Sequence, residues 1–121
     1  MNTVSLILTT YNSMKNLKTT LESIESQTYP AIEIIVKDGK STDGTLDVIK
    51  KYENKSKYSV RWVSCSDTGI YDAMNQGYVL STGNIIAYFN DTFAQKDAVQ
   101  KIVDLIEKTE EIMEFLTAKN E

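Results

Sequence analysis

A chain of 121 residues is long enough for one domain with a buried core but short for two. Its formal net charge is −4 and its basic side chains are scattered, which argues against a nucleic-acid partner because phosphate binding uses clustered Lys and Arg. The single cysteine, Cys65, excludes an internal disulfide, and the lack of histidine excludes His-based catalysis and His metal sites. The opening residues have no basic n-region and only a short apolar run. We therefore expect a cytoplasmic protein, either free or peripheral at the inner face of the membrane.

Short apolar stretches alternate with amphipathic stretches along the whole chain. The spacing predicts strands at residues 3–10, 32–37, 59–65 and 85–89, and helices at residues 14–27, 45–55, 70–82 and from about residue 95 to the end. Such alternation is typical of an α/β fold, in which a parallel sheet is covered by helices on both faces. We expect a single domain over residues 1–121.

The last predicted helix is longer than the strands need for cover. About 25 helical residues would span roughly 38 Å. Its apolar residues are expected to face inward: Val99, Ile102, Leu105, Ile106, Ile112, Met113 and Leu116. Either the helix bends near residues 109–111 and covers its own sheet, or it overhangs and meets another chain. We favour a homodimer through this helix, because the glutamates at residues 107–114 keep the opposite face solvated.

Polar residues follow each predicted strand, at the edge where open α/β sheets bind ligands. The carboxyl end of the first strand carries Thr9, Thr10, Tyr11 and Asn12, and that of the second carries residues 38–43. The end of the third carries Cys65, Ser66, Asp67 and Gly69, and that of the fourth carries Asn90, Asp91 and Thr92. The sequence therefore predicts a binding edge there.

Asp38 ends an apolar run, and its carboxylate can only accept hydrogen bonds. One hypothesis is that it accepts N–H bonds from a planar base, with Tyr11 stacked on that base. The alternative is that Asp38 binds only local turn amides. After it, residues 41–43 can cap the next helix. Neither G-x-G-x-x-G nor a P-loop occurs, which disfavours a dinucleotide or NTP site of those types.

A second polar stretch, "SDTGIYDAMNQG", covers residues 66–77. Its Asp67, Asp72 and Asn75 have two interpretations that spacing alone leaves open. They bind hydroxyls or a phosphate-linked metal, or they cap the start of the helix.

Two longer stretches carry a resemblance to a known family. "VSLILTTYNSMKNLKTTLESIESQTYPAIEIIVKDGKSTDGT" resembles the opening of the family 2 glycosyltransferases, which have the GT-A fold. "TGIYDAMNQGYVLSTGNIIAYFN" resembles the next block of the colanic-acid and capsule-type members. The resemblance covers about residues 3–100. It implies the Rossmann-like, donor-binding half of such an enzyme, with four strands in the order 3-2-1-4.

The resemblance also implies a function and a set of site residues. The family transfers a sugar from a nucleoside-diphosphate sugar to a hydroxyl acceptor, here expected in polysaccharide or cell-envelope glycan synthesis. The residues matching its nucleotide-sugar site are Thr9 and Tyr11 at the nucleoside, Asp38 at the base, Asp67 and Asn75 in the donor pocket, and Asn12 and Gly39 beside them. No catalytic residue is assigned.

The sequence departs from the family pattern in two ways. Members place an aspartate-rich motif after the fourth strand, where it holds a divalent metal, Mg²⁺ or Mn²⁺, against the diphosphate. Here the stretch is "FNDTF", and Asp91 is its one charged residue and a weak candidate ligand. The acceptor-binding half is also expected to be missing. The alternative function is therefore a non-catalytic nucleotide-sugar-binding or dimeric interaction module. A flavodoxin- or receiver-like domain is a third hypothesis, but the late lysine of a receiver cannot be located.

Overall fold

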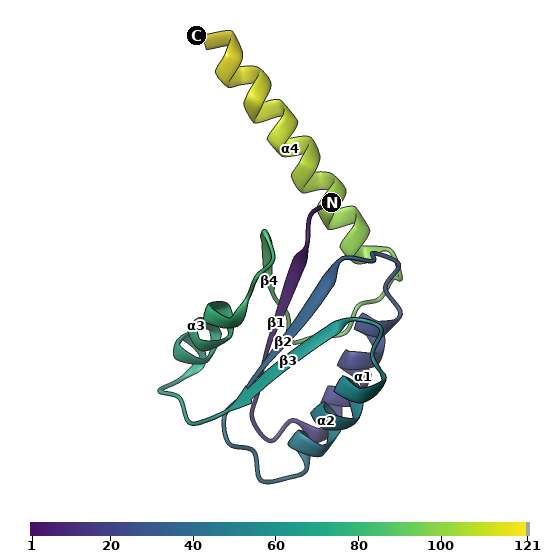
Figure 1. The fold of residues 1–121 in the computed structure, drawn as a ribbon, viewed down its shortest axis with the longest axis vertical. Coiled ribbons are helices and arrows are strands. Elements are labelled where there is room, and N and C mark those ends of the chain that lie inside the picture. Colours follow the sequence, from purple (N-terminus) through teal and green to yellow (C-terminus); the bar gives the residue numbers. More distant parts are fainter. Residues whose placement is uncertain (121) are drawn as a thin grey trace.

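The computed structural model of the chain describes the backbone of residues 1–120 and the side chains of residues 1–117. Strands and helices alternate throughout (Figure 1). The strands are β1 (Val4–Thr10), β2 (Ile32–Asp38), β3 (Ser59–Ser64) and β4 (Ile85–Tyr88), and the helices are α1 (Met14–Glu25), α2 (Thr45–Lys55), α3 (Ile70–Leu80) and α4 (Ala98–Asn120). Every predicted element is confirmed, with boundaries that differ by a few residues, except that the predicted end of the last helix, at residue 121, lies outside the described residues.

The four strands form one parallel sheet in the order β3-β2-β1-β4, as predicted. The register places Thr10 of β1 beside Asp38 of β2, and Asp38 beside Ser64 of β3. The carboxyl ends of these three strands therefore lie in one row. Strand order reverses at β1, which has β2 on one side and β4 on the other.

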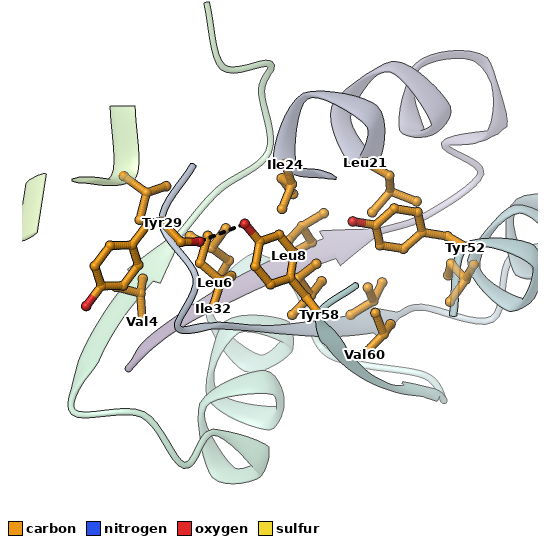
Figure 2. Packing of buried hydrophobic residues seen from close by; sticks show 14 of the residues in the cluster. Val4, Leu6, Leu8, Leu21, Ile24, Tyr29, Ile32, Tyr52, Tyr58 and Val60 are labelled. Carbon is orange, nitrogen blue, oxygen red and sulfur yellow. Dashed lines mark hydrogen bonds between the residues drawn. The ribbon is translucent and has the colours of Figure 1, made fainter. Parts of the chain in front are cut away.

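One face of the sheet packs against α1 and α2 and carries most of the core (Figure 2). Alternate strand residues point to this face, such as Leu6 and Leu8 in β1 and Ile34 in β2. They meet Leu21 and Ile24 of α1, which recur at helical spacing. Burial of these apolar side chains is the main force that holds the two helices on the sheet.

The opposite face of the sheet is covered by α3, which lies across β1 and β2 (Figure 1). The two packed elements approach closely because Gly77 has no side chain. A Cβ at Gly77 would lie 2.5 Å from Cγ2 of Ile7. This face also buries the charged residues Glu33 and Lys37 of β2.

The structure corrects the prediction for the last helix. Within the described part of α4, only Val99 and Val103 are buried. Ile106 is half-buried, and the other predicted inward residues are 45–68 % exposed: Ile102, Leu105, Ile112, Met113 and Leu116. The helix is continuous from Ala98 to Asn120 and projects away from the sheet, so of the two alternatives the bend near residues 109–111 is wrong (Figure 1). Helical spacing correctly identified an apolar face, but only Val99 and Val103, in the first turns of α4, join the core cluster. The homodimer stays a prediction.

Among the described residues, no helix is both long and apolar enough to cross a membrane.

Candidate nucleotide-sugar site

An open cavity of about 860 Å³ lies at the carboxyl ends of the strands. Its lining comes from the end of β1, the start of α1, and the segments that follow β2, β3 and β4. The residues are Leu8, Thr9, Thr10, Tyr11, Asn12, Ser13, Lys15, Asn16, Leu17, Thr20, Gly39, Ser66, Asp67, Gly69, Ile70, Ala73 and Asn90. Five predicted site residues are thus brought together: Thr9, Tyr11, Asn12, Gly39 and Asp67. Three others, Asp38, Asn75 and Asp91, do not belong to the lining.

Asn12 joins the loop after β1 to the loop after β2. Its backbone N–H donates to Oγ of Ser41 at 2.8 Å, and its side-chain Oδ1 accepts from the N–H of Thr42 at 2.8 Å. Asn12 has a φ of 46°, in the left-handed region that asparagine tolerates better than most residues. This turn presents the neighbouring Tyr11, which is 67 % exposed, at the edge of the cavity.

Asp43 holds the first residues of two helices. Its Oδ1 accepts from the N–H of Thr45 at 3.0 Å, and its Oδ2 accepts from the N–H of Met14 at 3.2 Å. The side-chain hydrogen bond from Thr45 is the main reason why the pKa of Asp43 lies below its usual value. The hydroxyl- and acid-rich loop after β2 therefore has the structural role that capping chemistry predicted.

Asp38 is fully buried, and its carboxylate is satisfied by neighbouring side chains and one amide. Oδ1 accepts from the hydroxyls of Thr10 (2.7 Å) and Ser41 (2.6 Å). Oδ2 accepts from the N–H of Ser41 (2.9 Å) and the hydroxyl of Ser64 (2.8 Å). Burial raises the pKa of Asp38, but the bonds from Ser41, Thr10 and Ser64 outweigh it and leave that pKa lowered. The structure thus shows Asp38 bonded within the protein, by three hydroxyls and one turn amide rather than by turn amides only. Base reading by Asp38 stays a prediction, and it requires this network to open.

Thr9 and Asn90 connect β1 to the segment after β4. The N–H of Thr9 donates to Oδ1 of Asn90 at 3.1 Å, and Nδ2 of Asn90 donates to Oγ1 of Thr9 at 3.0 Å. Both side-chain polar groups of Asn90 are therefore used within the protein. Next to this pair, the rings of Phe89 and Phe93 stack with centroids 4.0 Å apart.

Asn75 and Asp72 lie on α3. Asn75 is exposed and outside the cavity lining. Asp72 accepts from the N–H of Thr68 at 2.9 Å and from Nε2 of Gln76 at 3.1 Å. The bond from Thr68 is the largest reason why the pKa of Asp72 is lowered. For Asp72 the geometry agrees with the helix-capping interpretation.

The described residues do not by themselves provide a metal site. In that part of the chain, no three His, Cys, Asp or Glu side chains are grouped closely enough to hold a metal ion. Asp91 is exposed, with Oδ1 accepting from the N–H of Thr92 at 2.8 Å, and the amide of Asn90 is already paired with Thr9. One carboxylate is a poor match for a divalent cation, which takes several oxygen ligands.

One charged residue beside the cavity was not predicted from the sequence. Lys37 is completely buried, and its Nζ lies 3.1 Å from Oδ2 of Asp67. The available signal was a lysine one residue before the end of an otherwise apolar strand. Lys15 and Asp67 are the charged residues of the lining itself.

The family model described as glycosyl transferase family 2 matches residues 5–118, nearly the whole chain. The chain belongs to glycosyltransferase family 2. An uncharacterized glycosyltransferase of Mycobacterium tuberculosis is 35 % identical over 107 residues, which cover 86 % of this chain and 40 % of the relative. The chain spans 34–40 % of the length of the first curated relatives that it matches.

Solved structures agree with the family and with the GT-A fold. TarS of S. aureus in complex with UDP-GlcNAc superposes with a TM-score of 0.77 at 28 % identity, over 88 % of this chain and 31 % of TarS. The mannosyltransferase PcManGT of Pyrobaculum calidifontis, in complex with GDP-Man and Mn²⁺, gives a TM-score of 0.74 at 26 % identity, over 81 % of this chain and 30 % of that enzyme. The predicted family 2 membership and GT-A fold are confirmed, and the flavodoxin- or receiver-like hypothesis is set aside.

Proposed function

We propose that the cavity at the carboxyl ends of the strands binds a nucleoside-diphosphate sugar, as the donor site of a glycosyltransferase. The observation that carries this proposal is the convergence of Thr9, Tyr11, Gly39 and Asp67 on one cavity in a family 2 chain. They lie at or beyond the ends of three different strands, at the edge of an α/β sheet where ligands bind. TarS and PcManGT, which were solved with UDP-GlcNAc and GDP-Man, support this class of donor.

The lining residues suggest how the donor is held. The exposed ring of Tyr11 offers a flat apolar surface on which a base can stack. Asn12 and Ser13 hold the turn in place, since the N–H of Ser13 donates to Oγ1 of Thr45 at 2.8 Å. Lys15 is the lining residue with a positive charge for the diphosphate. A divalent cation would draw on diphosphate oxygens for most of its ligands, because Asp91 alone is insufficient.

The reaction and its setting are proposed for the complete protein. They comprise transfer of the sugar to a hydroxyl acceptor, a role in polysaccharide or cell-envelope glycan synthesis, and a cytoplasmic location. The resemblance to colanic-acid and capsule-type members motivates the pathway.

A thermal-shift panel of UDP, GDP, dTDP and CDP, each with and without Mn²⁺, tests the donor site. A nucleotide at 100 times its Kd stabilises the folded state by about 2.7 kcal/mol, so we expect a rise of several degrees in Tm for at least one of them. The shift should shrink in Tyr11→Ala but persist in Tyr88→Ala, whose ring lies on β4 outside the cavity lining. No shift with any nucleotide at millimolar concentration would overturn the proposal.

A non-catalytic nucleotide-sugar-binding module is the second candidate. The lack of grouped metal-binding carboxylates in the described part of the chain favours it. Turnover separates the two, because an enzyme should hydrolyse or transfer a bound nucleotide-sugar in the presence of Mg²⁺ or Mn²⁺. A module should bind the same compound without consuming it.

A further inference from the structure

β2 carries a lysine, Lys37, into the interior of the protein one residue before the strand ends. Its side chain has no exposed surface. The stem passes beneath α3, where the Cβ of Lys37 lies 3.9 Å from the position that a Cβ of Gly77 would occupy. A buried ammonium is unfavourable unless acceptors replace its hydration shell, so its partners indicate why it is there.

The ammonium of Lys37 has three acceptors, one for each of its N–H donors. They are the carbonyl oxygens of Asp38 (2.9 Å) and Cys65 (2.6 Å), and Oδ2 of Asp67 (3.1 Å). These belong to the end of β2, the residue after β3 and the loop that leads to α3. One cation therefore joins three segments at the edge of the sheet where the cavity lies.

Asp67 connects this buried cation to the cavity. Its side chain is 21 % exposed and lines the cavity. Its Oδ1 accepts from the N–H of Gly69 at 3.1 Å, and its Oδ2 would lie 3.1 Å from a Cβ at Gly39. Gly69 directly precedes α3, whose first residue, Ile70, also lines the cavity. The position of Asp67 therefore sets the position of this wall.

We propose that Lys37 is a positioning residue that holds Asp67 in the cavity wall and neutralises its charge toward a nucleoside diphosphate. This inference rests on the proposed function. A diphosphate is negatively charged, and a carboxylate without a counter-ion in a partly desolvated wall would repel it. The Lys37 side chain has no exposed surface and does not line the cavity, so its effect on a bound diphosphate passes through the one acceptor that does, Asp67.

The same face of the sheet offers a matched control. Nη2 of Arg61, in β3, lies 2.5 Å from Oε1 of Glu33. Glu33 is on β2 like Lys37, but toward the amino end of that strand. Neither member of this second pair lines the cavity. Removing its cation, which is 44 % exposed, unpairs a buried carboxylate on the same strand without touching the proposed site.

The first measurement is calorimetry with UDP and uridine, or with GDP and guanosine if the protein binds that base. We expect Lys37→Met to weaken binding of the diphosphate about tenfold or more and binding of the uncharged nucleoside about threefold or less. Adding Asp67→Asn to Lys37→Met removes the unpaired charge and should return the ratio of the two affinities to within about threefold of the wild-type ratio. Arg61→Met should leave that ratio unchanged. A wild-type ratio in Lys37→Met, or no recovery in the double variant, would overturn the proposal.

The second measurement needs no ligand. Amide hydrogen exchange at Gly69 should accelerate in Lys37→Met, because Asp67 loses its anchor, and should not change in Arg61→Met. Unchanged exchange in both variants would show that Lys37 does not position the loop. If the wild-type protein binds no nucleotide, the proposed function fails while the exchange result still decides the positioning role. Should Lys37→Met not fold, Lys37→Gln takes its place in every comparison.

Discussion

Each end of β2 carries a buried charged residue in an ion pair, Glu33 at the amino end and Lys37 at the carboxyl end, and the two pairs differ in their surroundings. At the amino end, Glu33 pairs with Arg61 and also accepts hydrogen bonds from Ser5 and from both the N–H and the hydroxyl of Thr82. At the carboxyl end, Lys37 is the fully buried partner, and Asp67 keeps part of its surface open to the cavity. In the first pair the carboxylate of Glu33 is enclosed by protein partners while Arg61 is 44 % exposed, whereas the second pair borders a site.

The difference follows from the topology of a parallel sheet. At the amino end, the segment after α3 returns to the sheet, and the N–H of Gly83 donates to Oγ of Ser5 at 2.9 Å. At the carboxyl end, the loops diverge toward their helices and leave a cavity between them. An ion pair therefore serves stability at the amino end of β2, whereas at the carboxyl end we propose that an ion pair serves ligand binding. The following predictions test that contrast, beginning with the largest expected effect.

Removing the anion of the carboxyl-end pair should be the most damaging change. Asp67→Ala leaves the ammonium of Lys37 buried without a counter-charge, which costs about 3–5 kcal/mol in the free energy of unfolding. Urea denaturation measures this loss. The double variant Lys37→Met with Asp67→Ala should recover most of it, because no uncompensated charge remains. A loss below about 1 kcal/mol in the single variant would mean that water reaches the ammonium and that the pair is less enclosed than its contacts indicate.

The amino-end pair should appear in the pH dependence of stability. Burial raises the pKa of Glu33, but hydrogen bonds from Thr82, Ser5 and Arg61 outweigh it and lower that pKa from 4.5 to about 2. Below pH 4.5 the unfolded chain takes up a proton that the folded protein excludes. The stabilisation is therefore complete above pH 4.5 and is lost as the pH falls toward 2, by an amount on the order of 3 kcal/mol.

Glu33→Gln should flatten the decline in Tm between pH 4.5 and 2.5 and lower stability at pH 7. Glu22→Gln, which changes an exposed side chain of α1, is the control and should leave the profile unchanged. A decline as steep in Glu33→Gln as in the wild type would assign the acid sensitivity to other carboxylates.

The cover over both pairs depends on the close packing of α3. Gly77→Ala introduces a Cβ 2.5 Å from Cγ2 of Ile7, a strain of about 1–3 kcal/mol. Helix propensity alone favours alanine over glycine by about 1 kcal/mol, so the net loss in the free energy of unfolding should be at most about 2 kcal/mol. Val79→Ala, at an exposed position of α3, should stay within about 0.5 kcal/mol in the same denaturation experiment. A stabilised Gly77→Ala protein would show that α3 can move away from the sheet.

The part of α4 that projects beyond the sheet includes neither ion pair, and substitutions there should have the smallest effect on stability. Leu105→Glu and Phe115→Glu alter exposed side chains, so each should change the stability of a monomer by less than about 0.5 kcal/mol. Light scattering tests the homodimer prediction. If two chains pair through α4, the wild-type mass should rise with concentration and both variants should remain monomeric. A wild-type mass that stays constant at the monomer value would rule the dimer out.

The elements and their order were predictable because they depend on local spacing. Leu17, Leu21 and Ile24 recur at helical spacing, and β2 is an apolar run, so each segment carries its own signal. The family resemblance supplied the strand order. The resemblance also selected Thr9 and Tyr11, which line the cavity in the structure. It selected Asn75 as well, but Asn75 does not line the cavity.

The sequence by itself determined the alternation of strands and helices, the parallel sheet and the polar edge at its carboxyl ends, because periodicity and turn chemistry act over a few residues. Only the tertiary structure decided which charges meet. Lys37 and Asp67 are 30 residues apart, and their contact depends on the register of β2 with β3. The tertiary structure also decided how much of α4 is exposed. Spacing shows that a helix has an apolar face, but the packing of the rest of the chain determines how much of that face is covered.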